Sequence, residues 1–331
     1  MVWLKFAICV LVIFFLGKKV ARYGDIIADK TGLGGVWVGL VIISLVTSLP
    51  ELFTGISAIT IVDAPDLTIG NIFGANTYNL LNLALLDMMH KNGSLFRVIG
   101  PGHRMTAWFS LSITAIAAIA VFISHQFSPV NLGWIGWYTP VIIIIYIIAI
   151  RMLFLHEQKQ PTISDNEIKL LEENDIPLKK VYIYFAISSL LIIGAGTWLA
   201  LIGDEIALSY GWGQSFVGNL FIGFSTTLPE ITVSFAAMRL GAVDIAVANM
   251  IGSNLFNMTI VAIDDLIYTK GSVLSAVSEI HLQSALVVII MTAILLIGLY
   301  VKPKRFFRFS WLNCLLLVLF FVGAYFSFST V

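Results

Sequence analysis

The chain has 331 residues, of which 59% are apolar and only 11% are charged, and its formal net charge is zero. A soluble protein carries about a quarter charged residues. The composition therefore excludes an ordinary soluble protein and predicts one that crosses the membrane several times. The lipid bilayer is the expected surrounding, and no nucleic-acid partner is expected.

Ten apolar stretches of roughly the length that a membrane-spanning helix needs, about 17 to 25 residues, follow one another along the chain. The first half holds stretches at 2–22, 34–62, 66–88, 105–125 and 134–154. The second half holds stretches at 182–203, 215–238, 243–266, 283–301 and 306–329. The first stretch resembles a signal peptide, but Gly17-Lys18-Lys19 follows it instead of a small-residue cleavage site, so we expect a retained helix. The polar residues 156–180 are expected to form a connecting loop.

Two of these stretches contain the same unusual pentapeptide, Thr47-Ser48-Leu49-Pro50-Glu51 and Thr226-Thr227-Leu228-Pro229-Glu230. Because proline has no backbone N–H, the carbonyls of Val46 and Ser225 should lose their helical partners. A carboxylate in the middle of a membrane costs about 3 kcal/mol on insertion scales, which makes it a candidate functional group. Carboxylate, hydroxyl and carbonyl oxygens are the ligands that Ca²⁺ and Na⁺ prefer.

The two halves of the chain repeat one another in polar residues as well as apolar ones. Beyond the pentapeptide, at an offset of 179 and then 178 residues, the matches are Gly24-Asp25 with Gly203-Asp204, Asp66 with Asp244, Asn71 with Asn249, Gly74 with Gly252, Asn76 with Asn254, Asn79 with Asn257, and Asp87 with Asp265. Five spans is an odd number, so the second half should enter the membrane upside down. The predicted fold is an all-α polytopic membrane protein of ten transmembrane helices in two inverted five-helix repeats, 1–155 and 181–331, an arrangement typical of secondary transporters.

A second shared motif follows each pentapeptide, at 70–79 and at 248–257, so that the two repeated regions extend over 44–82 and 223–260. Ser253 and Asn257 lie four residues apart and share one face of a helix. Gly74 and Gly252 lack side chains and should let another helix approach closely. Asn76 and Asn254 could either hold helices together or bind ions, and the sequence leaves both roles open.

With both motifs in view, the chain resembles the prokaryotic sodium/calcium exchangers of the cation/Ca²⁺ antiporter superfamily over its whole length. The resemblance implies a set of ion ligands, namely Thr47, Ser48, Glu51, Asn79, Thr226, Thr227, Glu230, Ser253 and Asn257. It implies no cofactor, with Ca²⁺ and Na⁺ as transported substrates. The chain departs from the family pattern at a few positions: Val46 and Ser225 replace glycine, Thr227 and Ala75 replace serine, and Asn257 stands where some relatives have aspartate.

The positive charges predict an orientation. If both termini lie outside, 17 of the 19 Lys and Arg residues fall in inner loops, and only Lys5 and Lys270 lie outside. We therefore expect a plasma (inner) membrane protein with a cytoplasmic central loop. The oligomeric state is left open, with a monomer as one option.

The predicted activity is export of Ca²⁺ in exchange for Na⁺, and not an enzymatic reaction. Exchange of Ca²⁺, or of another divalent cation, for H⁺ is the alternative. A membrane enzyme built on Asp264-Asp265 is disfavoured, because we expect this pair to be solvated at a helix end. A channel is disfavoured because a deep acidic site binds too tightly for fast conduction. Asp25, Asp66, Asp204 and Asp244 could attract cations to the entrances, and the five histidines look scattered without zinc-type spacing.

Overall fold

The computed structural model describes residues 1–30, 43–91, 93–97, 99–127, 131–157, 177–239, 241–304 and 306–329. The first half contains α1 (Val2–Lys30), α3 (Ser44–Thr47), α4 (Leu49–Ser57), η2 (Ala58–Val62), α5 (Pro65–Met89), η3 (Leu95–Arg97), α6 (Pro101–Gln126), β1 (Asn131–Leu132), β2 (Ile135–Gly136) and α7 (Tyr138–Glu157). The second half contains α8 (Leu178–Tyr210), α9 (Gln214–Val217), η4 (Gly218–Ile222), α10 (Gly223–Thr226), α11 (Leu228–Arg239), α12 (Val243–Ile267), α13 (Val273–Ala276), α14 (Ile280–Val301) and α15 (Trp311–Ser329). The fold is that of a mostly helical membrane protein.

Within the described residues, six helices are long and apolar enough to cross a membrane: α6, α7, α8, α12, α14 and α15. A seventh span results if the bent pair Gln214–Thr226 and Leu228–Arg239 is counted as one. The other three predicted spans are helical in their described parts, in α1, in α3 to η2, and in α5. Residues 34–42 of the span predicted at 34–62 lie outside the described residues. These three are not among the long apolar helices, so their crossing stays a prediction.

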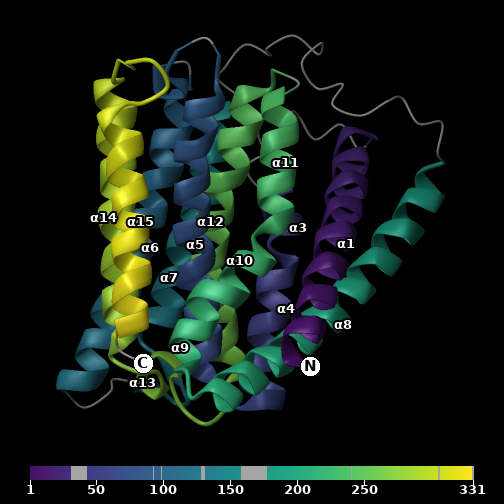
Figure 1. Ribbon diagram of the computed structural model, residues 1–331, viewed down its shortest axis with the longest axis vertical. Coiled ribbons are helices and arrows are strands. Elements are labelled where there is room, and N and C mark those ends of the chain that lie inside the picture. The colour runs from purple at the N-terminus through teal and green to yellow at the C-terminus, as the bar shows by residue number, and fades with distance from the viewer. Residues whose placement is uncertain are drawn as a thin grey trace.

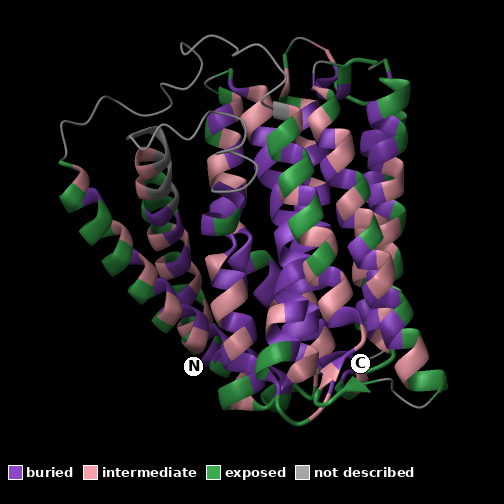
Figure 2. Cartoon of the chain, turned by 180° about the vertical axis from the view of Figure 1, so that it is seen from behind, coloured by how far each residue is buried: buried purple, intermediate pink, exposed green. Residues whose placement is uncertain are grey.

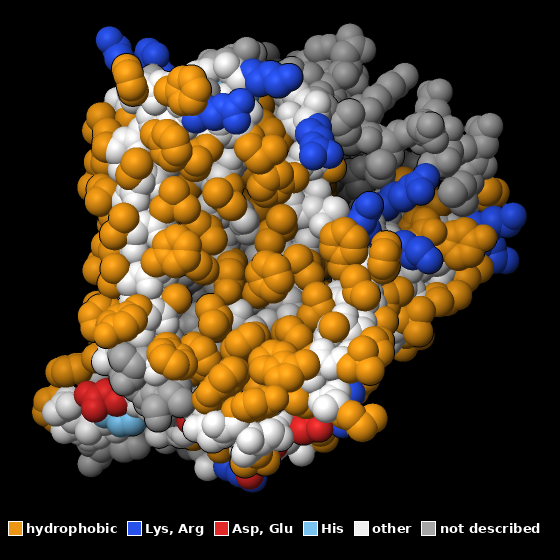
Figure 3. Space-filling model, in the orientation of Figure 1, with side chains coloured by type: hydrophobic (Ala, Val, Ile, Leu, Met, Phe, Trp, Pro, Cys, Tyr) orange, Lys and Arg blue, Asp and Glu red, His pale blue; other side chains and the backbone are white. Residues whose placement is uncertain are grey.

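The helices form a bundle with α5 and α12 at its centre and with α1 and α8 leaning against one side (Figure 1). Of the most apolar 18 residues of each helix, 94% are buried in α12 and 39% in α8, which distinguishes the core from the periphery (Figure 2). Helix α1 begins and α15 ends at the lower end of Figure 1, whereas α7 ends and α8 begins at the upper end. Lys and Arg side chains gather at that upper end (Figure 3).

Both pentapeptides interrupt a helix, as predicted. In the first copy α3 stops at Thr47, Ser48 has φ −86° and ψ 11°, and α4 resumes with Pro50 in its first turn. In the second copy the helix axis bends by 42° between α10 and α11. Proline is tolerated at the start of a helix, where an N–H has no intrahelical partner, so each pentapeptide starts a new helix within the span.

Glycines allow helices to meet backbone to backbone around these breaks. A Cβ on Gly74 would lie 2.1 Å from the carbonyl oxygen of Asn219, and a Cβ on Gly218 would lie 2.5 Å from that of Leu67. Helix α5 and the π-helical segment η4 therefore pack at a distance that no side chain permits. The close-approach role predicted for Gly74 is confirmed.

A second pair of glycines places α1 and α8 against the broken helices. A Cβ on Gly17 in α1 would lie 2.3 Å from Cγ of Pro229, and a Cβ on Gly196 in α8 would lie 3.1 Å from the backbone nitrogen of Thr54. These two glycines are 179 residues apart, the offset at which the pentapeptides repeat. Each leaning helix therefore rests on the broken span of the other half.

The expectation that Asp264 and Asp265 are solvated is wrong, because both side chains are fully buried. Asp265 accepts hydrogen bonds from the backbone N–H groups of Gly136 and Val273, both at 2.7 Å, and from the hydroxyls of Tyr138 and Thr139. The β1–β2 hairpin and the first residues of α7 and α13 thus close over the end of α12. This carboxylate stabilises the loops around it.

Two histidines that looked scattered in the sequence occupy matched positions. His281 Nε2 lies 2.9 Å from Asp66 Oδ1 and links α14 to α5, while His103 Nε2 lies 3.1 Å from Asp244 Oδ1 and links α6 to α12. The histidines are 178 residues apart, as are the two aspartates. Asp66 and Asp244 therefore tie helices together, a role not predicted from the sequence. Of the other two expected entrance charges, Asp204 accepts a hydrogen bond from Gln214, and the side chain of Asp25 lies outside the described part.

Candidate functional site

The two pentapeptides come together in the centre of the bundle, where the residues predicted to bind ions are fully buried. This holds for all nine, namely Thr47, Ser48, Glu51, Asn79, Thr226, Thr227, Glu230, Ser253 and Asn257. They are contributed by α3, α4 and α5 from one half and by α10, α11 and α12 from the other, with Ser48 and Thr227 at the two breaks. Burial of so many polar groups inside a membrane protein is costly unless they are paired or hold a ligand.

Of the two glutamates, Glu230 has the carboxylate that accepts hydrogen bonds. Its Oε1 accepts hydrogen bonds from Ser48 Oγ at 2.9 Å and from Ser253 Oγ at 3.4 Å. Its Oε2 has no hydrogen-bond partner among the described residues. Thr47 Oγ1 completes the group at 3.5 Å from Ser253 Oγ. One hydroxyl from each half of the chain thus donates to Oε1 of this carboxylate, and Oε2 is left without a donor in the described part.

Glu51 has a different environment. Neither of its carboxylate oxygens has a hydrogen-bond partner within the described residues, although the side chain has no exposure at all. Its backbone carbonyl accepts a long hydrogen bond, 3.5 Å, from Asn71 Nδ2. A buried carboxylate without donors is unstable as a bare anion, so this pair of oxygens is suited to receive a cation.

Asn71 and Asn249 make equivalent contacts with the two pentapeptides, one asparagine in each half of the chain. Thr226 Oγ1 donates to Asn71 Oδ1 at 2.9 Å, and Thr47 Oγ1 donates to Asn249 Oδ1 at 3.2 Å. Asn249 Nδ2 in turn donates to the carbonyl of Glu230 at 3.2 Å, as Asn71 does to that of Glu51. Asn71 and Asn249 were matched in the sequence but not assigned to the site. Their common offset was the signal that could have identified them as positioning residues.

Four further asparagines cross-link α5 and α12. Asn79 Nδ2 donates to Asn254 Oδ1 at 3.0 Å, and Asn257 Nδ2 donates to Asn76 Oδ1 at 3.1 Å. The carbonyl oxygens Oδ1 of Asn79 and Asn257 have no partner among the residues described. Asn76 and Asn254 thus link the two helices and orient Asn257 and Asn79, which is the first of the two roles that the sequence left open.

Thr227 is the candidate that the structure engages least. Its hydroxyl donates to the carbonyl of Gly223 at 2.5 Å, one turn earlier in the chain. Of the four hydroxyls in the two pentapeptides, only that of Ser48 donates to a carboxylate, while Thr47 and Thr226 bind the asparagines. The pentapeptides are therefore alike in sequence and unequal in their contacts.

The arrangement offers hard oxygen ligands and little else. Within this site, the oxygens that have no partner among the described residues come from Glu51, Glu230, Asn79 and Asn257. Among the described residues no group of three or more His, Cys, Asp and Glu could hold a metal, so amide and hydroxyl oxygens would have to complete any coordination shell. Carboxylate and amide oxygens of this kind suit Ca²⁺ and Na⁺.

Comparison with known proteins agrees with this chemistry. A family model described as sodium/calcium exchanger protein matches residues 1–155 and 180–330. The chain belongs to this family. The two matched segments contain both copies of the pentapeptide, and residues 156–179 lie between them.

Individual relatives of this exchanger family member span most of its length. The inner membrane protein YrbG of Escherichia coli is 24% identical over 265 residues, covering 80% of this chain and 78% of that protein. The membrane protein MJ0091 of Methanocaldococcus jannaschii is 24% identical over 323 residues, covering 94% and 95%. A solved structure of the sodium-calcium exchanger NCX_Mj, soaked with Na⁺ and Sr²⁺, superposes with a TM-score of 0.63 at 20% identity and covers 98% of both chains. The fold is therefore the exchanger fold.

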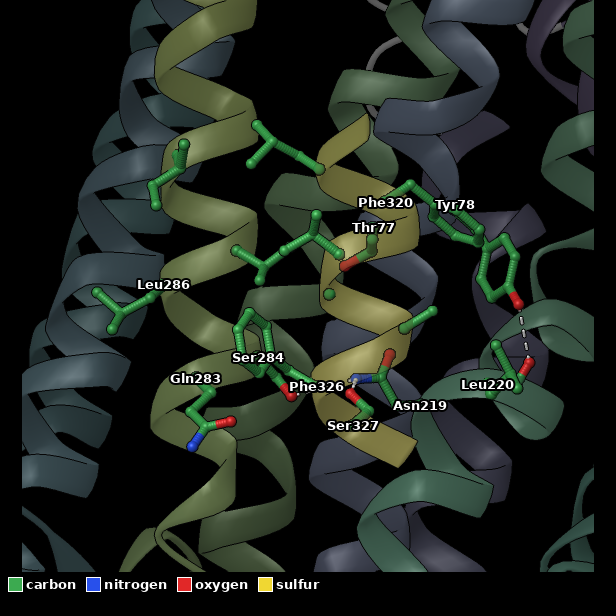
Figure 4. Close-up of a pocket in the computed structure, with 16 residues that line it drawn as sticks. Thr77, Tyr78, Asn219, Leu220, Gln283, Ser284, Leu286, Phe320, Phe326 and Ser327 are labelled. Atoms are coloured by element: carbon green, nitrogen blue, oxygen red, sulfur yellow. Dashed lines mark hydrogen bonds between the residues drawn. The ribbon is translucent and has the colours of Figure 1, made fainter. Parts of the chain in front are cut away.

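A separate cavity of about 290 Å³ lies between α5, η4, α14 and α15 (Figure 4). Its walls are mostly apolar, and at one end Asn219 Nδ2 donates to the hydroxyls of Ser284 and Ser327, both at 3.1 Å. It contains none of the nine candidate residues. This cavity is distinct from the polar centre of the bundle.

Proposed function

We propose that this protein is a secondary antiporter that exports Ca²⁺ in exchange for Na⁺ by alternating access, with the ions bound near the bilayer midplane between the two pentapeptides. The observation that carries the proposal is Glu51, whose fully buried carboxylate has no donor among the described residues. A charged group in such a place requires a counter-ion. Glu230, with one unpartnered oxygen, supplies the second negative charge.

The charge balance favours a divalent ion over a monovalent one as the exported substrate. Two carboxylates neutralise one Ca²⁺, and neutral oxygens of Asn79, Asn257, Ser48 and Ser253 extend its shell toward the six to eight ligands that Ca²⁺ takes. When Ca²⁺ leaves, two negative charges would remain close together at low dielectric. Counter-ions must replace it before the carrier reorients, which makes the transport an exchange.

We further propose ten membrane spans in two inverted repeats, 1–155 and 181–331. The support is that matched residues contact the opposite half in the same way: Asn71 and Asn249, Gly17 and Gly196, and the pairs His281–Asp66 and His103–Asp244. The proposed orientation places both termini outside the plasma membrane and the link between the halves in the cytoplasm. The gathering of Lys and Arg at the end where α7 stops supports it (Figure 3).

Reconstitution tests this function directly. Ca²⁺-loaded liposomes containing the purified protein should release Ca²⁺ when Na⁺ is added outside, and should not do so in choline. A pH gradient in sodium-free buffer is the second arm, and release in that arm alone would replace Na⁺ by H⁺ as the coupling ion. Absence of release in both arms from correctly folded protein would refute antiport.

A further inference from the structure

Asp264 is a third buried carboxylate that the proposed ion site does not use. Its side chain has no exposure, and neither oxygen has a hydrogen-bond partner within the described part of the chain. The adjacent Asp265 accepts four hydrogen bonds. Two neighbouring carboxylates thus have opposite environments: Asp265 is saturated by donors and stabilises the fold, and Asp264 has none.

The carboxylate of Asp264 lies over the backbone of Gly55 in α4. A Cβ on Gly55 would lie 2.9 Å from Oδ2 and 3.4 Å from Oδ1 of Asp264. Gly55 follows Glu51 by four residues, so both lie on the same face of α4. On α12, Asp264 follows Asn257 by seven residues and shares its face. The two helices therefore carry unpartnered oxygens from the central site toward the end of the bundle where α12 stops.

The other half of the chain has no counterpart to this feature. At the repeat offset of 178, Asp264 corresponds to Leu86, and at 179, Gly55 corresponds to Ser234. Leu86 is fully buried and apolar, and Ser234 accepts a hydrogen bond from Asn249. The acid and the glycine that it packs against therefore occur together on one side of the central site only.

We propose that Asp264 is an additional, one-sided Na⁺-binding station between the central site and the membrane face where the termini lie. A single carboxylate balances one monovalent cation, and its oxygens are hard ligands. Ca²⁺ would be left half-neutralised there. The role of this site in transport rests on the proposed antiport. Binding of Na⁺ at Asp264 does not, because it can be measured without any transport.

The binding test uses the full-length protein in detergent, with choline replaced by Na⁺ at constant ionic strength. The variant Glu51→Gln/Glu230→Gln removes both charges of the central site. Its melting temperature should still rise with Na⁺, since a ligand bound only by the native state stabilises it. Adding Asp264→Asn, which keeps the size of the side chain, should abolish that rise. The proposed site would be refuted if Na⁺ did not raise the melting temperature of the double variant, or raised it equally after Asp264→Asn.

Two further variants distinguish binding from a change in packing or surface charge. Gly55→Ala keeps every charge but places a methyl group 2.9 Å from Asp264 Oδ2, so it should weaken the Na⁺ response as Asp264→Asn does. Asp63→Asn is the matched control: Asp63 lies on the same side, is more than half exposed and pairs with Lys270 at 2.6 Å. That hydrogen bond raises the pKa of Lys270. Asp63→Asn should leave the Na⁺ response unchanged.

If the triple variant does not fold, the single variant Asp264→Asn serves instead. Its half-saturating Na⁺ concentration for thermal stabilisation should rise about tenfold, which corresponds to about 1.4 kcal/mol. In oriented vesicles, Asp264→Asn should raise the half-saturating Na⁺ concentration only when Na⁺ is supplied on the membrane face where the termini lie. Equal shifts from both faces, or none, would overturn the one-sided station. If the parent protein binds Na⁺ through Asp264 but transports nothing, the antiport proposal fails and the station stands.

Discussion

At the scale of single residues, the two glutamates differ in the number of hydrogen-bond donors to their carboxylates, although the sequences around them repeat. Ser48 and Ser253 donate to Glu230, whereas neither carboxylate oxygen of Glu51 has a donor in the described part of the chain. In the absence of ions, Glu51 is therefore the more destabilising of the two. In the proposed antiport, its charge balances the second positive charge of Ca²⁺.

We expect Glu51→Gln to abolish Ca²⁺ transport while leaving the ion-free protein as stable as the parent or more stable. The amide keeps the size of the side chain and removes an unpaired buried charge, which costs several kcal/mol. Thermal unfolding in EGTA and Ca²⁺ flux in liposomes measure the two effects. Glu230→Gln should lose transport with a smaller gain in stability, because its carboxylate already has donors. Full transport by either folded variant would refute the ligand assignment.

Ser48 provides a test of the contact between the halves. Removing its hydroxyl by Ser48→Ala deletes the donor to Glu230, a contact worth about 1.5 kcal/mol or more when the acceptor is charged. The half-saturating Ca²⁺ concentration should rise about tenfold. Ser57→Ala is the control, because Ser57 is on the adjacent α4 and its hydroxyl bonds to Thr197 instead. If both variants have the same Ca²⁺ dependence, Ser48 does not act through Glu230.

At the scale of elements, the broken helices are kept in place by glycine contacts as much as by polar ones. Helix α5 meets α9 at Gly70 and meets η4 at Gly74 and Gly218, and at each of these glycines a Cβ would overlap backbone atoms of the other segment. Backbone atoms cannot move aside as a side chain can. The approach of the second pentapeptide to the asparagines of α5 therefore depends on this contact.

Gly74→Ala should destabilise the protein by about 1 to 3 kcal/mol or more, the usual cost of overpacking, because the new methyl group would lie 2.1 Å from a carbonyl oxygen. Gly194→Ala in α8 is the matched control, since a Cβ there has no atom within 4 Å. That change should be neutral or stabilise by up to about 1 kcal/mol, as alanine favours helix. Thermal unfolding of both variants measures the two changes in stability. A Gly74→Ala protein as stable as Gly194→Ala would mean that α5 and η4 are not tightly packed.

At the scale of the whole molecule, α1 and α8 lean against a bundle centred on α5 and α12 (Figure 1). They contact the broken helices through Gly17 and Gly196, and Lys5 pairs with Glu205 at 2.8 Å to join them near one end. Each of them therefore contacts the broken span of the opposite half. Alternating access needs such contacts to rearrange about the central site.

Coupling to Na⁺ predicts a response to membrane voltage. If more positive charge enters with Na⁺ than leaves with Ca²⁺, an inside-negative potential should speed Ca²⁺ export, at about 2.3 kcal/mol per net charge for each 100 mV. Potassium gradients with valinomycin set the potential in liposomes while Ca²⁺ flux is recorded. Exchange that ignores voltage would instead indicate an electroneutral cycle, such as two H⁺ for each Ca²⁺.

The helices and the two acidic pentapeptides could be predicted from local sequence features, whereas the full set of nine candidate ligands came from the family resemblance. Long apolar stretches predicted the helices, and a proline followed by a carboxylate predicted both breaks, because proline acts on its own turn wherever it stands. The repeat offset related residues across the two halves. The same offset also relates Gly17 to Gly196 and His103 to His281.

Which partner each polar side chain finds depended on segments distant in the chain. Asp264 and Asp265 are neighbours, yet only Asp265 meets the hairpin at 131–136, because successive residues of a helix point about 100° apart and only one faced the incoming loop. For the same reason the amides of Asn76 and Asn254 became cross-links, and Thr227 turned to its own helix. Helix rotation and packing set these contacts, and no local pattern encodes them. The unpartnered carboxylate of Asp264 is therefore a property of the fold and not of its sequence neighbourhood.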